Sequence, residues 1–286
     1  MTAGYTRSPV FQLLSKREAT KTREATINKV PTMKIIRSIT VVLAALTVVL
    51  VACSASTVNV AEQKSLVLVA GATGGTGRAM VRNLLGQGYA VRVFARDAAK
   101  ARVVLGDDIE YAEGDVRDIE TINAAMLNVR FVISSIGGSR DDPTNGPEFV
   151  DFGGVKNLAQ AAAVADVEHF VLVSSSGVTH EDHFLNKIMN NVLNWKFAGE
   201  QALRESGVPY TIVRPGGLVT KPGGIDSLVF AQGDSTAGTI NREDVALICI
   251  AALSNPEALN RTFETFSSES PGTNDWQAMF DGLAAD

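Results

Sequence analysis

Cysteine and histidine are scarce in this sequence. Its 286 residues include two cysteines, Cys53 and Cys249, and three histidines. The cysteines form no CxxC motif and no spacing typical of a disulfide framework. The sequence also lacks an HExxH motif, a Cys/His cluster and a group of carboxylates at metal-ligand spacing. We therefore expect no metal site, and we expect Cys249, which lies in an apolar run, to be a core residue.

Positive charge is sparse beyond residue 60, where lysines and arginines form no cluster. The formal net charge is -5, whereas a surface that binds a nucleic-acid duplex needs clustered lysine and arginine. Nucleic acid is therefore excluded as the main partner. The chain has no internal repeat, and no low-complexity linker interrupts it after residue 64. With 45% hydrophobic residues it can bury one sizeable core.

Charge is absent altogether from residues 39–52. This apolar run follows two basic residues and ends at Cys53, a layout typical of a secretory signal. The segment resembles the signal of a bacterial lipoprotein, which implies lipidation of Cys53 and a membrane-associated protein. The expected parts are a leader or misassigned start (residues 1–32), a signal or membrane anchor (33–53) and a linker (54–63).

Two other interpretations of the N-terminal region remain open. Residues 38–61 are uncharged and long enough to cross a bilayer as an uncleaved anchor. An organelle transit segment is the second alternative, although Glu18 and Glu24 are unusual in a leader that is normally poor in acidic residues. A lipid or an anchor would tether the rest of the chain to a membrane, on a side that the sequence leaves undefined.

From residue 64 onward, short apolar strands alternate with amphipathic helices. Such alternation is typical of a parallel sheet with helices on both faces. We predict an α/β fold over residues 64–286: a Rossmann-type, doubly wound parallel sheet in a single domain, with a small C-terminal portion that covers the substrate. The expected strands are residues 65–70, 90–95, 109–113, 131–134, 169–174 and 210–214, and the expected helices are 76–87, 119–127, 151–165 and 184–206.

A glycine-rich turn links the first expected strand to the first expected helix. It reads Gly-Ala-Thr-Gly-Gly-Thr-Gly over residues 71–77, with GxxGxxG spacing. Glycine in such a turn adopts backbone angles closed to other residues and lets backbone N–H groups approach a pyrophosphate at the helix N-terminus. The strand–turn–helix context favours dinucleotide binding over a tight turn that binds nothing. The expected cofactor contacts are Gly71, Thr73, Gly74, Gly75, Thr76 and Gly77.

Charged residues follow the second and third expected strands. NAD-preferring sites usually carry an acidic residue after the second strand, but here Arg96 stands there, and a guanidinium suits a 2′-phosphate. We therefore expect NADP, with NAD as the alternative. If Arg96 binds no nucleotide, it is a solvated loop residue paired with Asp97. Asp115 is assigned either to the adenine amino group or to a helix cap.

A set of further motifs is spread along the chain. It comprises residues 71–77, Gly-Asp-Val at 114–116, Val-Ser-Ser-Ser-Gly at 173–177, Asn-Trp-Lys at 194–196, Gly-Val-Pro-Tyr-Thr-Ile-Val-Arg-Pro-Gly at 207–216 and Asn-Arg-Glu-Asp-Val-Ala at 241–246. Together these segments resemble the atypical short-chain dehydrogenase/reductase family, especially its NAD(P)-binding, NmrA-like and SDR-a5-like members. The resemblance implies a nicotinamide near the ends of the fourth and fifth strands. Ser134, Ser174 and Pro215 are then expected cofactor contacts.

The usual catalytic tyrosine of that superfamily is missing. Lys196 matches the lysine that binds the ribose, but the tyrosine position four residues earlier holds Val192, and none of the four tyrosines lies in this helix. The resemblance implies a cofactor and catalytic role for Lys196, with a solvent-facing lysine as the alternative. Ser175 is a second catalytic candidate. His180 and His183 are further candidates for the proton donor, or are merely solvated.

Two functions fit these motifs. One is an oxidoreductase that transfers hydride between NADP(H) and a small carbonyl or quinone-like acceptor, covered by the loops at residues 137–149 and 220–238. The other is a non-catalytic dinucleotide-binding protein, which serves as a redox sensor or as a scaffold or assembly factor tethered to a membrane. Val192 favours the second function. Hydride transfer itself requires no tyrosine, so we place the oxidoreductase first.

Overall fold

The computed structural model describes residues 65–286, apart from the side chain of Glu269. The expected leader (residues 1–32), signal or anchor (33–53) and linker (54–63) lie outside the described residues, as does Cys53. The division of the N-terminal region into these parts therefore stays a prediction.

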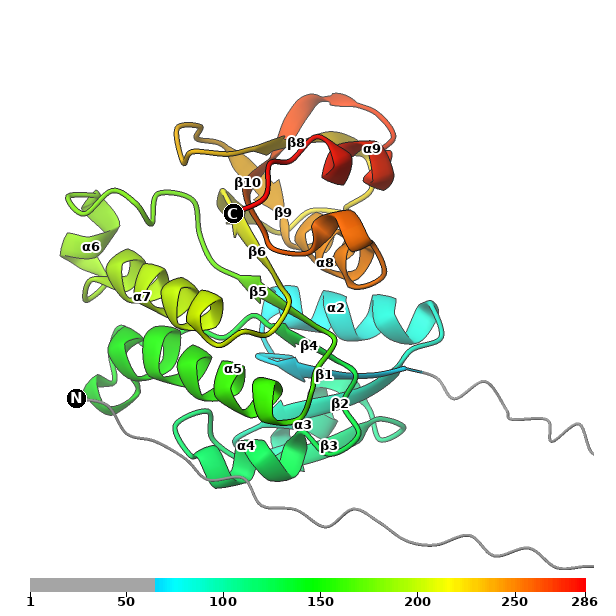
Figure 1. The fold of residues 1–286 in the computed structure, drawn as a ribbon, viewed down its shortest axis with the longest axis vertical. Coiled ribbons are helices and arrows are strands. Elements are labelled where there is room, and N and C mark those ends of the chain that lie inside the picture. Colours follow the sequence, from blue (N-terminus) through cyan, green and yellow to red (C-terminus); the bar gives the residue numbers. More distant parts are fainter. Residues whose placement is uncertain (1–64) are drawn as a thin grey trace, which may run out of the picture. The chain divides into compact units, whose positions relative to one another are not determined.

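An eight-stranded sheet forms the centre of the described part (Figure 1). Its order is β3-β2-β1-β4-β5-β6-β10-β8, and every pairing is parallel except that of β10 with β8. The order reverses between β1 and β4, which confirms the predicted doubly wound, Rossmann-type fold. The strands are β1 (Leu66–Ala70), β2 (Ala90–Ala95), β3 (Glu110–Glu113), β4 (Phe131–Ser134), β5 (His169–Val173), β6 (Tyr210–Pro215), β8 (Asp226–Ala231) and β10 (Arg261–Pro271).

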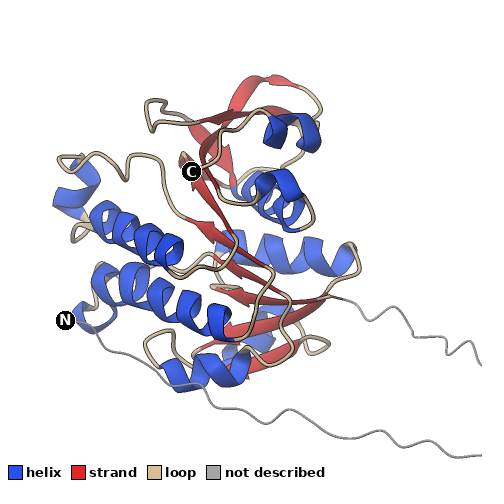
Figure 2. Cartoon of the chain, viewed as in Figure 1, coloured by secondary structure: helices blue, strands red, loops and turns tan. Residues whose placement is uncertain are grey.

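Helices cover both faces of the sheet (Figure 2). Successive side chains of a strand point to opposite faces, so Val67 and Val69 join one hydrophobic cluster while Leu68 and Ala70 join another. The first cluster packs against α2 (Gly75–Gly86), α3 (Ala98–Leu105), α8 (Arg242–Leu253) and α9 (Trp276–Asp281). The second packs against α4 (Ile119–Ala125), α5 (Val155–Val164) and α7 (Val192–Glu205). The expected core position of Cys249 is confirmed, because its side chain is fully buried in the first cluster.

The predicted helix over residues 184–206 is in fact two helices, α6 (Phe184–Ile188) and α7. Asn190 and Asn191 separate them with φ values of 50° and 56°, a left-handed conformation that asparagine adopts more readily than most residues. Oδ1 of Asn186 accepts a hydrogen bond from the backbone N of Leu193 at 2.9 Å. The prediction of a continuous helix is wrong because these local side-chain-to-backbone bonds compete with helical pairing.

The helix expected at residues 151–165 starts with a π-helical segment, η2 (Glu148–Gly154), which runs directly into α5. Gly199 of α7 packs against this segment, and a Cβ at Gly199 would collide with the backbone oxygen of Asp151. The close approach of α7 to η2 therefore depends on that glycine. This close approach brings the side chain of Asp151 next to side chains of α7.

A smaller C-terminal portion lies beyond β6. It contains a two-stranded parallel sheet of β7 (Gly217–Val219) and β9 (Thr239–Asn241), the antiparallel pair β8 and β10, and α9. The sequence motif at residues 241–246 marks only the start of α8 in this portion. Three short 3-10 or π segments complete the structure: η1 (Pro143–Asn145), η2 and η3 (Pro256–Ala258).

Candidate functional site

A groove of 320 Å³ lies where the strand order reverses. Ligands of doubly wound sheets bind at this point, outside the carboxyl ends of the strands. The groove is bounded by the turn after β1 and by the residues that follow β2, β3 and β4. Its lining residues are Gly71, Ala72, Thr73, Gly74, Phe94, Ala95, Arg96, Gly114, Val116, Ser135, Ile136, Gly137, Asn145 and Val150.

The glycines of the 71–77 turn, termed here the phosphate loop, have different tasks. Gly71 has φ +83°, and a Cβ there would lie 2.6 Å from the backbone oxygen of Ser135. A Cβ on Gly77 would lie 2.7 Å from Cα of Ala72. Both positions thus require glycine for the loop to lie flat against β1 and β4. Gly74 has room for a Cβ, so its part is to place the backbone at the helix start.

The N-terminus of α2 is open toward the groove. Its N-cap is Gly74, no side chain caps it, and its first turn carries no acidic residue. By contrast α3, α4 and α9 are capped by the carboxylates of Asp97, Asp118 and Asp275. The first backbone N–H groups of a helix need an acceptor and carry partial positive charge. At α2 these donors suit an anionic ligand, and the groove beside them lies where doubly wound sheets bind their ligands.

Arg96 lies at the rim of the groove and is exposed. The alternative pairing with Asp97 is not observed. The Asp97 carboxylate accepts from the backbone N of Lys100 at 2.9 Å and lies 3.0 Å from its Nζ. The Arg96 guanidinium takes part in none of the ion pairs of residues 65–286. It is therefore available for a phosphate.

Asp115 has a partner that the sequence did not indicate. Nε and Nη2 of Arg117 donate to its carboxylate at 2.9 and 2.6 Å, and these side-chain hydrogen bonds lower the pKa of Asp115. The helix cap that was its alternative role belongs to Asp118, whose carboxylate accepts from the backbone N of Glu120. Gly114 and Val116 line the groove while Asp115 does not. The contact of Asp115 with adenine stays a prediction.

The serines at the strand ends alternate between buried and accessible positions. Ser134 is fully buried and its hydroxyl has no partner among the described residues, whereas Ser135 lines the groove. Ser174 is likewise buried with an unpartnered hydroxyl, whereas Ser175 is half-buried and donates to the backbone oxygen of Ser176 at 3.0 Å. Ser135 stands at the strand end expected near the nicotinamide, but the predicted contact was Ser134, although successive residues of a strand face opposite sides. Pro215 is buried at the end of β6.

Lys196 is held by a buried carboxylate. Its Nζ lies 2.7 Å from Oδ1 of Asp151, which is 1% exposed, and Oδ2 of Asp151 accepts from the backbone N of Gly138 at 2.7 Å. Oδ1 accepts no aligned hydrogen bond, so its contact with Lys196 is ionic. The Lys196 side chain is 18% exposed, unlike the solvent-facing lysine that was its alternative. Asp151 thus ties Lys196 to the loop after β4.

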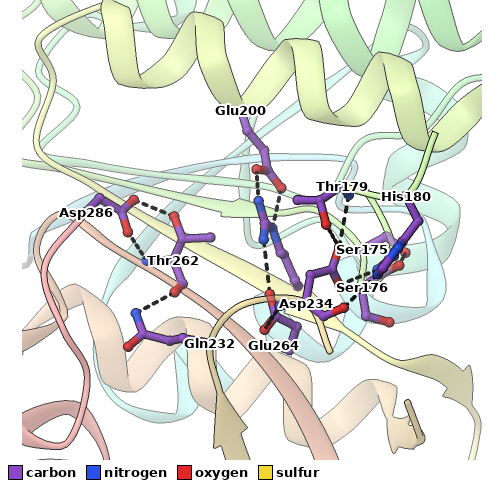
Figure 3. Close-up of polar contacts among 12 residues, drawn as sticks. Ser175, Ser176, Thr179, His180, Glu200, Gln232, Asp234, Thr262, Glu264 and Asp286 are labelled. Carbon is purple, nitrogen blue, oxygen red and sulfur yellow. Dashed lines mark hydrogen bonds and ion pairs between the residues drawn. The ribbon is translucent and has the colours of Figure 1, made fainter. Parts of the chain in front are cut away.

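The two histidines after β5 are held by structural hydrogen bonds. Nε2 of His180 lies 2.8 Å from the backbone oxygen of Asp234, and Nδ1 of His183 accepts from the backbone N of Leu185. Figure 3 shows Asp234 facing Thr179, whose backbone N and hydroxyl donate to it at 3.0 and 2.8 Å. Burial raises the pKa of Asp234, but hydrogen bonds from Gly177 and Thr179 outweigh it and leave that pKa lowered. Asp234 thereby fixes the loop after β5.

A buried charge network adjoins Asp234, and Figure 3 shows its two glutamates, Glu200 and Glu264, on either side of it. Arg214 donates from Nε and Nη2 to Glu200 at 2.9 and 2.7 Å, and from Nη1 to Glu264 at 3.1 Å. The other oxygen of Glu264 accepts from the backbone N of Asp234 at 2.9 Å. Burial opposes the charge on Arg214, but the two carboxylates keep its pKa raised. The sequence placed Arg214 at the strand end and missed its two partners, which come from α7 and β10.

Residues 71–256 match the family model described as NAD(P)H-binding. The chain belongs to this NAD(P)H-binding family. The match begins at Gly71, the first residue of the phosphate loop, and it includes every residue that lines the groove. The predicted resemblance to the atypical short-chain dehydrogenase/reductase family is confirmed as far as membership of an NAD(P)H-binding family.

Curated relatives of this family member include a reductase and an assembly factor. Sanguinarine reductase of Eschscholzia californica is 35% identical, over 77% of this chain and 96% of that protein. Protein TIC 62, chloroplastic, of Pisum sativum is 38% identical, over 55% of this chain and 33% of its own length. Photosystem II assembly factor Ycf39 of Trieres chinensis is 31% identical, over 68% of this chain and 62% of that protein.

Solved structures share the fold of this family member. A putative NAD-dependent epimerase/dehydratase from Bacillus halodurans has a TM-score of 0.67 at 21% identity, covering 77% of this chain and 100% of its own. ChuY, an anaerobilin reductase from Escherichia coli O157:H7, has a TM-score of 0.62 at 21% identity, with 72% and 98% covered. A short-chain dehydrogenase/reductase from Veillonella parvula in complex with NADP has a TM-score of 0.59 at 15% identity, with 72% and 96% covered.

The prediction of a lipid-anchored, membrane-associated lipoprotein is wrong. The relatives with which this family member aligns include chloroplastic plant proteins, among them TIC 62, rather than bacterial lipoproteins. An apolar run ending at a cysteine is a short and permissive pattern, and here it misled the assignment of Cys53. Within residues 65–286, no helix has the length and apolar character needed to cross a membrane.

Proposed function

We propose that the protein is an NADPH-dependent reductase that transfers hydride to a small carbonyl or quinone-like acceptor. The observation that carries the proposal is the uncapped N-terminus of α2 beside a groove lined by Arg96, which makes no ion pair with any of residues 65–286. Backbone donors there suit the pyrophosphate, and Arg96 suits the 2′-phosphate that distinguishes NADP from NAD. NADPH supplies the hydride when bound, and the chain supplies orientation.

The residues at the nicotinamide end of the groove have positioning roles. Asp151 holds Lys196 close to Gly137 and Gly138 after β4, where the ammonium can donate to a ribose hydroxyl. We expect the nicotinamide, as the family resemblance implies, beside the strand ends that carry Ser135 and Ser175. Ser175 is half-buried and its hydroxyl donates to the backbone oxygen of Ser176, so its oxygen can accept from and orient a water molecule that delivers the proton the absent tyrosine would supply.

The names of two similar proteins support a reductase. One is a sanguinarine reductase and the other is an anaerobilin reductase. We expect this protein to oxidise NADPH in the presence of at least one carbonyl or quinone-like acceptor, and stopped-flow absorbance at the nicotinamide band measures this directly.

The test uses the full chain with NADPH and a panel of quinones, aldehydes and ketones. Lys196→Met is expected to lower kcat, because the ribose is then less well oriented, while Lys187→Met, in the neighbouring helix α6, serves as the control. A wild-type protein that binds NADPH and reduces nothing in the panel would refute the reductase proposal.

A second candidate is a non-catalytic, dinucleotide-binding assembly factor. Val192 at the tyrosine position and the structural hydrogen bonds of His180 and His183 favour it, because they leave few proton donors near the nicotinamide. The relative Ycf39 is, by its name, a photosystem II assembly factor. Tight NADPH binding without turnover is the outcome that selects this candidate over the reductase.

A further inference from the structure

The side chain of Arg242 lies against the phosphate loop, although it is 165 residues or more distant from it in sequence. A Cβ built on Gly75 would come within 2.7 Å of Cδ and 3.0 Å of Nε of Arg242. Gly75 is the first residue of α2, so the arginine stem lies beside the start of that helix. Glycine at position 75 is therefore what admits Arg242 to the site.

Two helix N-termini meet at Arg242. It is the first residue of α8, and it packs onto the first residue of α2; each helix has twelve residues. A helix N-terminus carries partial positive charge, so a cation at this place is unfavourable unless an anion is present. None of the ion pairs among the described side chains includes Arg242. Within the described part of the chain, no acidic side chain pairs with this positive charge.

The two acidic residues that follow Arg242 are engaged elsewhere. Glu243 pairs with Arg82 and accepts from the side-chain amide of Asn83 at 2.6 Å. Asp244 accepts from the backbone N of Gly224 at 2.6 Å and from Asn241 at 2.9 Å. Neither carboxylate is directed at Arg242. Its lack of a counter-charge is thus a property of the local hydrogen-bond arrangement.

The guanidinium is held in place by one of its nitrogens. Nη1 donates to the backbone oxygen of Leu218 at 3.2 Å and to the hydroxyl of Thr220 at 2.9 Å. Within residues 65–286, Nε and Nη2 donate to no protein acceptor. An arginine with one nitrogen anchored and two donors free is suited to a phosphate, which accepts two parallel hydrogen bonds.

We propose that Arg242 binds the pyrophosphate of the dinucleotide through Nε and Nη2, opposite the backbone donors of α2. This inference rests on the proposed nucleotide binding. It adds a residue that contacts the pyrophosphate, which NADP and NAD have in common. Its task therefore differs from that of Arg96, which is assigned to the 2′-phosphate. The bond to Leu218 and Thr220 also links the pyrophosphate site to the C-terminal portion of the domain.

The test is a titration of the full chain with NADPH and, separately, with NADH. Arg242→Met keeps the stem and removes the charge, and it is expected to weaken both nucleotides by the same factor, about tenfold to a hundredfold. Arg96→Met is expected to weaken NADPH alone. Arg130→Met is the matched control, because Arg130 precedes β4 at the opposite edge of the sheet and pairs with Glu168.

Each outcome decides one question. Unchanged affinity in Arg242→Met overturns the inference, and so does a loss confined to NADPH, which would assign Arg242 to the 2′-phosphate. A wild-type chain that binds neither nucleotide overturns the proposed function instead. If Arg242→Met does not fold, Arg242→Lys decides. Lysine keeps the charge without the planar fork, so both affinities are expected to fall by about tenfold, and wild-type affinities would refute the assignment.

Discussion

At the scale of single residues, the described arginines differ mainly in whether their guanidinium groups are paired with carboxylates. Arg214 is enclosed by two buried carboxylates, and Arg117 is committed to Asp115. Arg96 and Arg242 make no ion pair within the described part of the chain, and both lie beside the phosphate loop. An unpaired arginine at a helix N-terminus costs stability unless an anion binds there. These two positions are therefore where a nucleotide would contribute most.

His169 provides a prediction about pH at the same scale. It is 2% exposed, its Nε2 lies 2.8 Å from the hydroxyl of Thr211, and burial lowers its pKa to about 4. In the unfolded chain the His169 imidazole has a pKa near the ordinary histidine value. Between that pH and about 4, the unfolded state therefore binds one proton more than the folded state. The free energy of unfolding should therefore fall as the pH is lowered from about 7.5 to about 5, by roughly 2 kcal/mol.

Urea denaturation at both pH values measures this effect. In His169→Gln the fall should be largely absent, whereas His180→Gln, a variant of a more exposed histidine, should retain it. Carboxylates titrate mainly below this pH window and do not obscure the comparison. An identical pH dependence in His169→Gln and the wild type would contradict the assignment.

A site residue could be predicted from the sequence when its role depends on neighbouring residues, but not when it depends on a contact between distant segments. Gly71 and Gly77 were predicted because a strand–turn–helix sequence shows directly where glycine is needed. Asp151 was not, because only the π-helical segment and Gly199 bring it to Lys196. Arg242 was missed as a site residue for the same reason: its partner, Gly75, lies far away in the sequence.

At the scale of elements, helix α2 contains two glycines, Gly77 and Gly86, that differ in how closely other atoms approach them. Gly77→Ala would push a methyl group into the backbone of Ala72, whereas a methyl group at Gly86 would meet no atom within 4 Å. We expect Gly77→Ala to weaken NADPH by more than about a hundredfold, because the loop must move from the pyrophosphate. Gly86→Ala should bind normally and be more stable by up to about 1 kcal/mol, because alanine favours helix.

Fluorescence titration and thermal unfolding of both variants check this pair. Equal nucleotide affinity in Gly77→Ala and Gly86→Ala would show that the packing of the loop against β1 does not matter for binding.

Elements with a clear period were predictable, and irregular ones were not. The strands from β1 to β6 are short apolar runs, and their predicted positions agree with the structure to within about a residue or two. The break between α6 and α7 was missed because the apolar pattern continues through Asn190 and Asn191. The strands β7 to β10 were missed because β7 and β9 are only three residues long and polar residues interrupt β10, which also has an irregular register against β8.

At the scale of the whole molecule, one buried network joins the main sheet to the C-terminal portion. Glu200 of α7 and Glu264 of β10 meet at Arg214 of β6, and Asp234 continues the network to the loop after β5. Breaking a buried ion pair leaves an uncompensated charge. We therefore expect Glu200→Gln to lower the free energy of unfolding by about 3 kcal/mol.

Equilibrium urea unfolding of the full chain measures that loss. Glu257→Gln is the control, since Glu257 is half-exposed and lies 3.9 Å from Arg261, and it should change stability by less than about 0.5 kcal/mol. Similar stability of the two variants would show that the network adds nothing to the cohesion of the domain.

The central claim is that the groove at the reversal of strand order holds a dinucleotide by its phosphates. Calorimetric titration of the full chain with NADPH tests it most directly, with Gly77→Ala as the variant that keeps every charge. One NADPH bound per wild-type chain, with affinity that falls as salt is added and is lost in Gly77→Ala, is the predicted result. Absence of binding to the wild-type chain, or equal binding to the variant, would contradict the account.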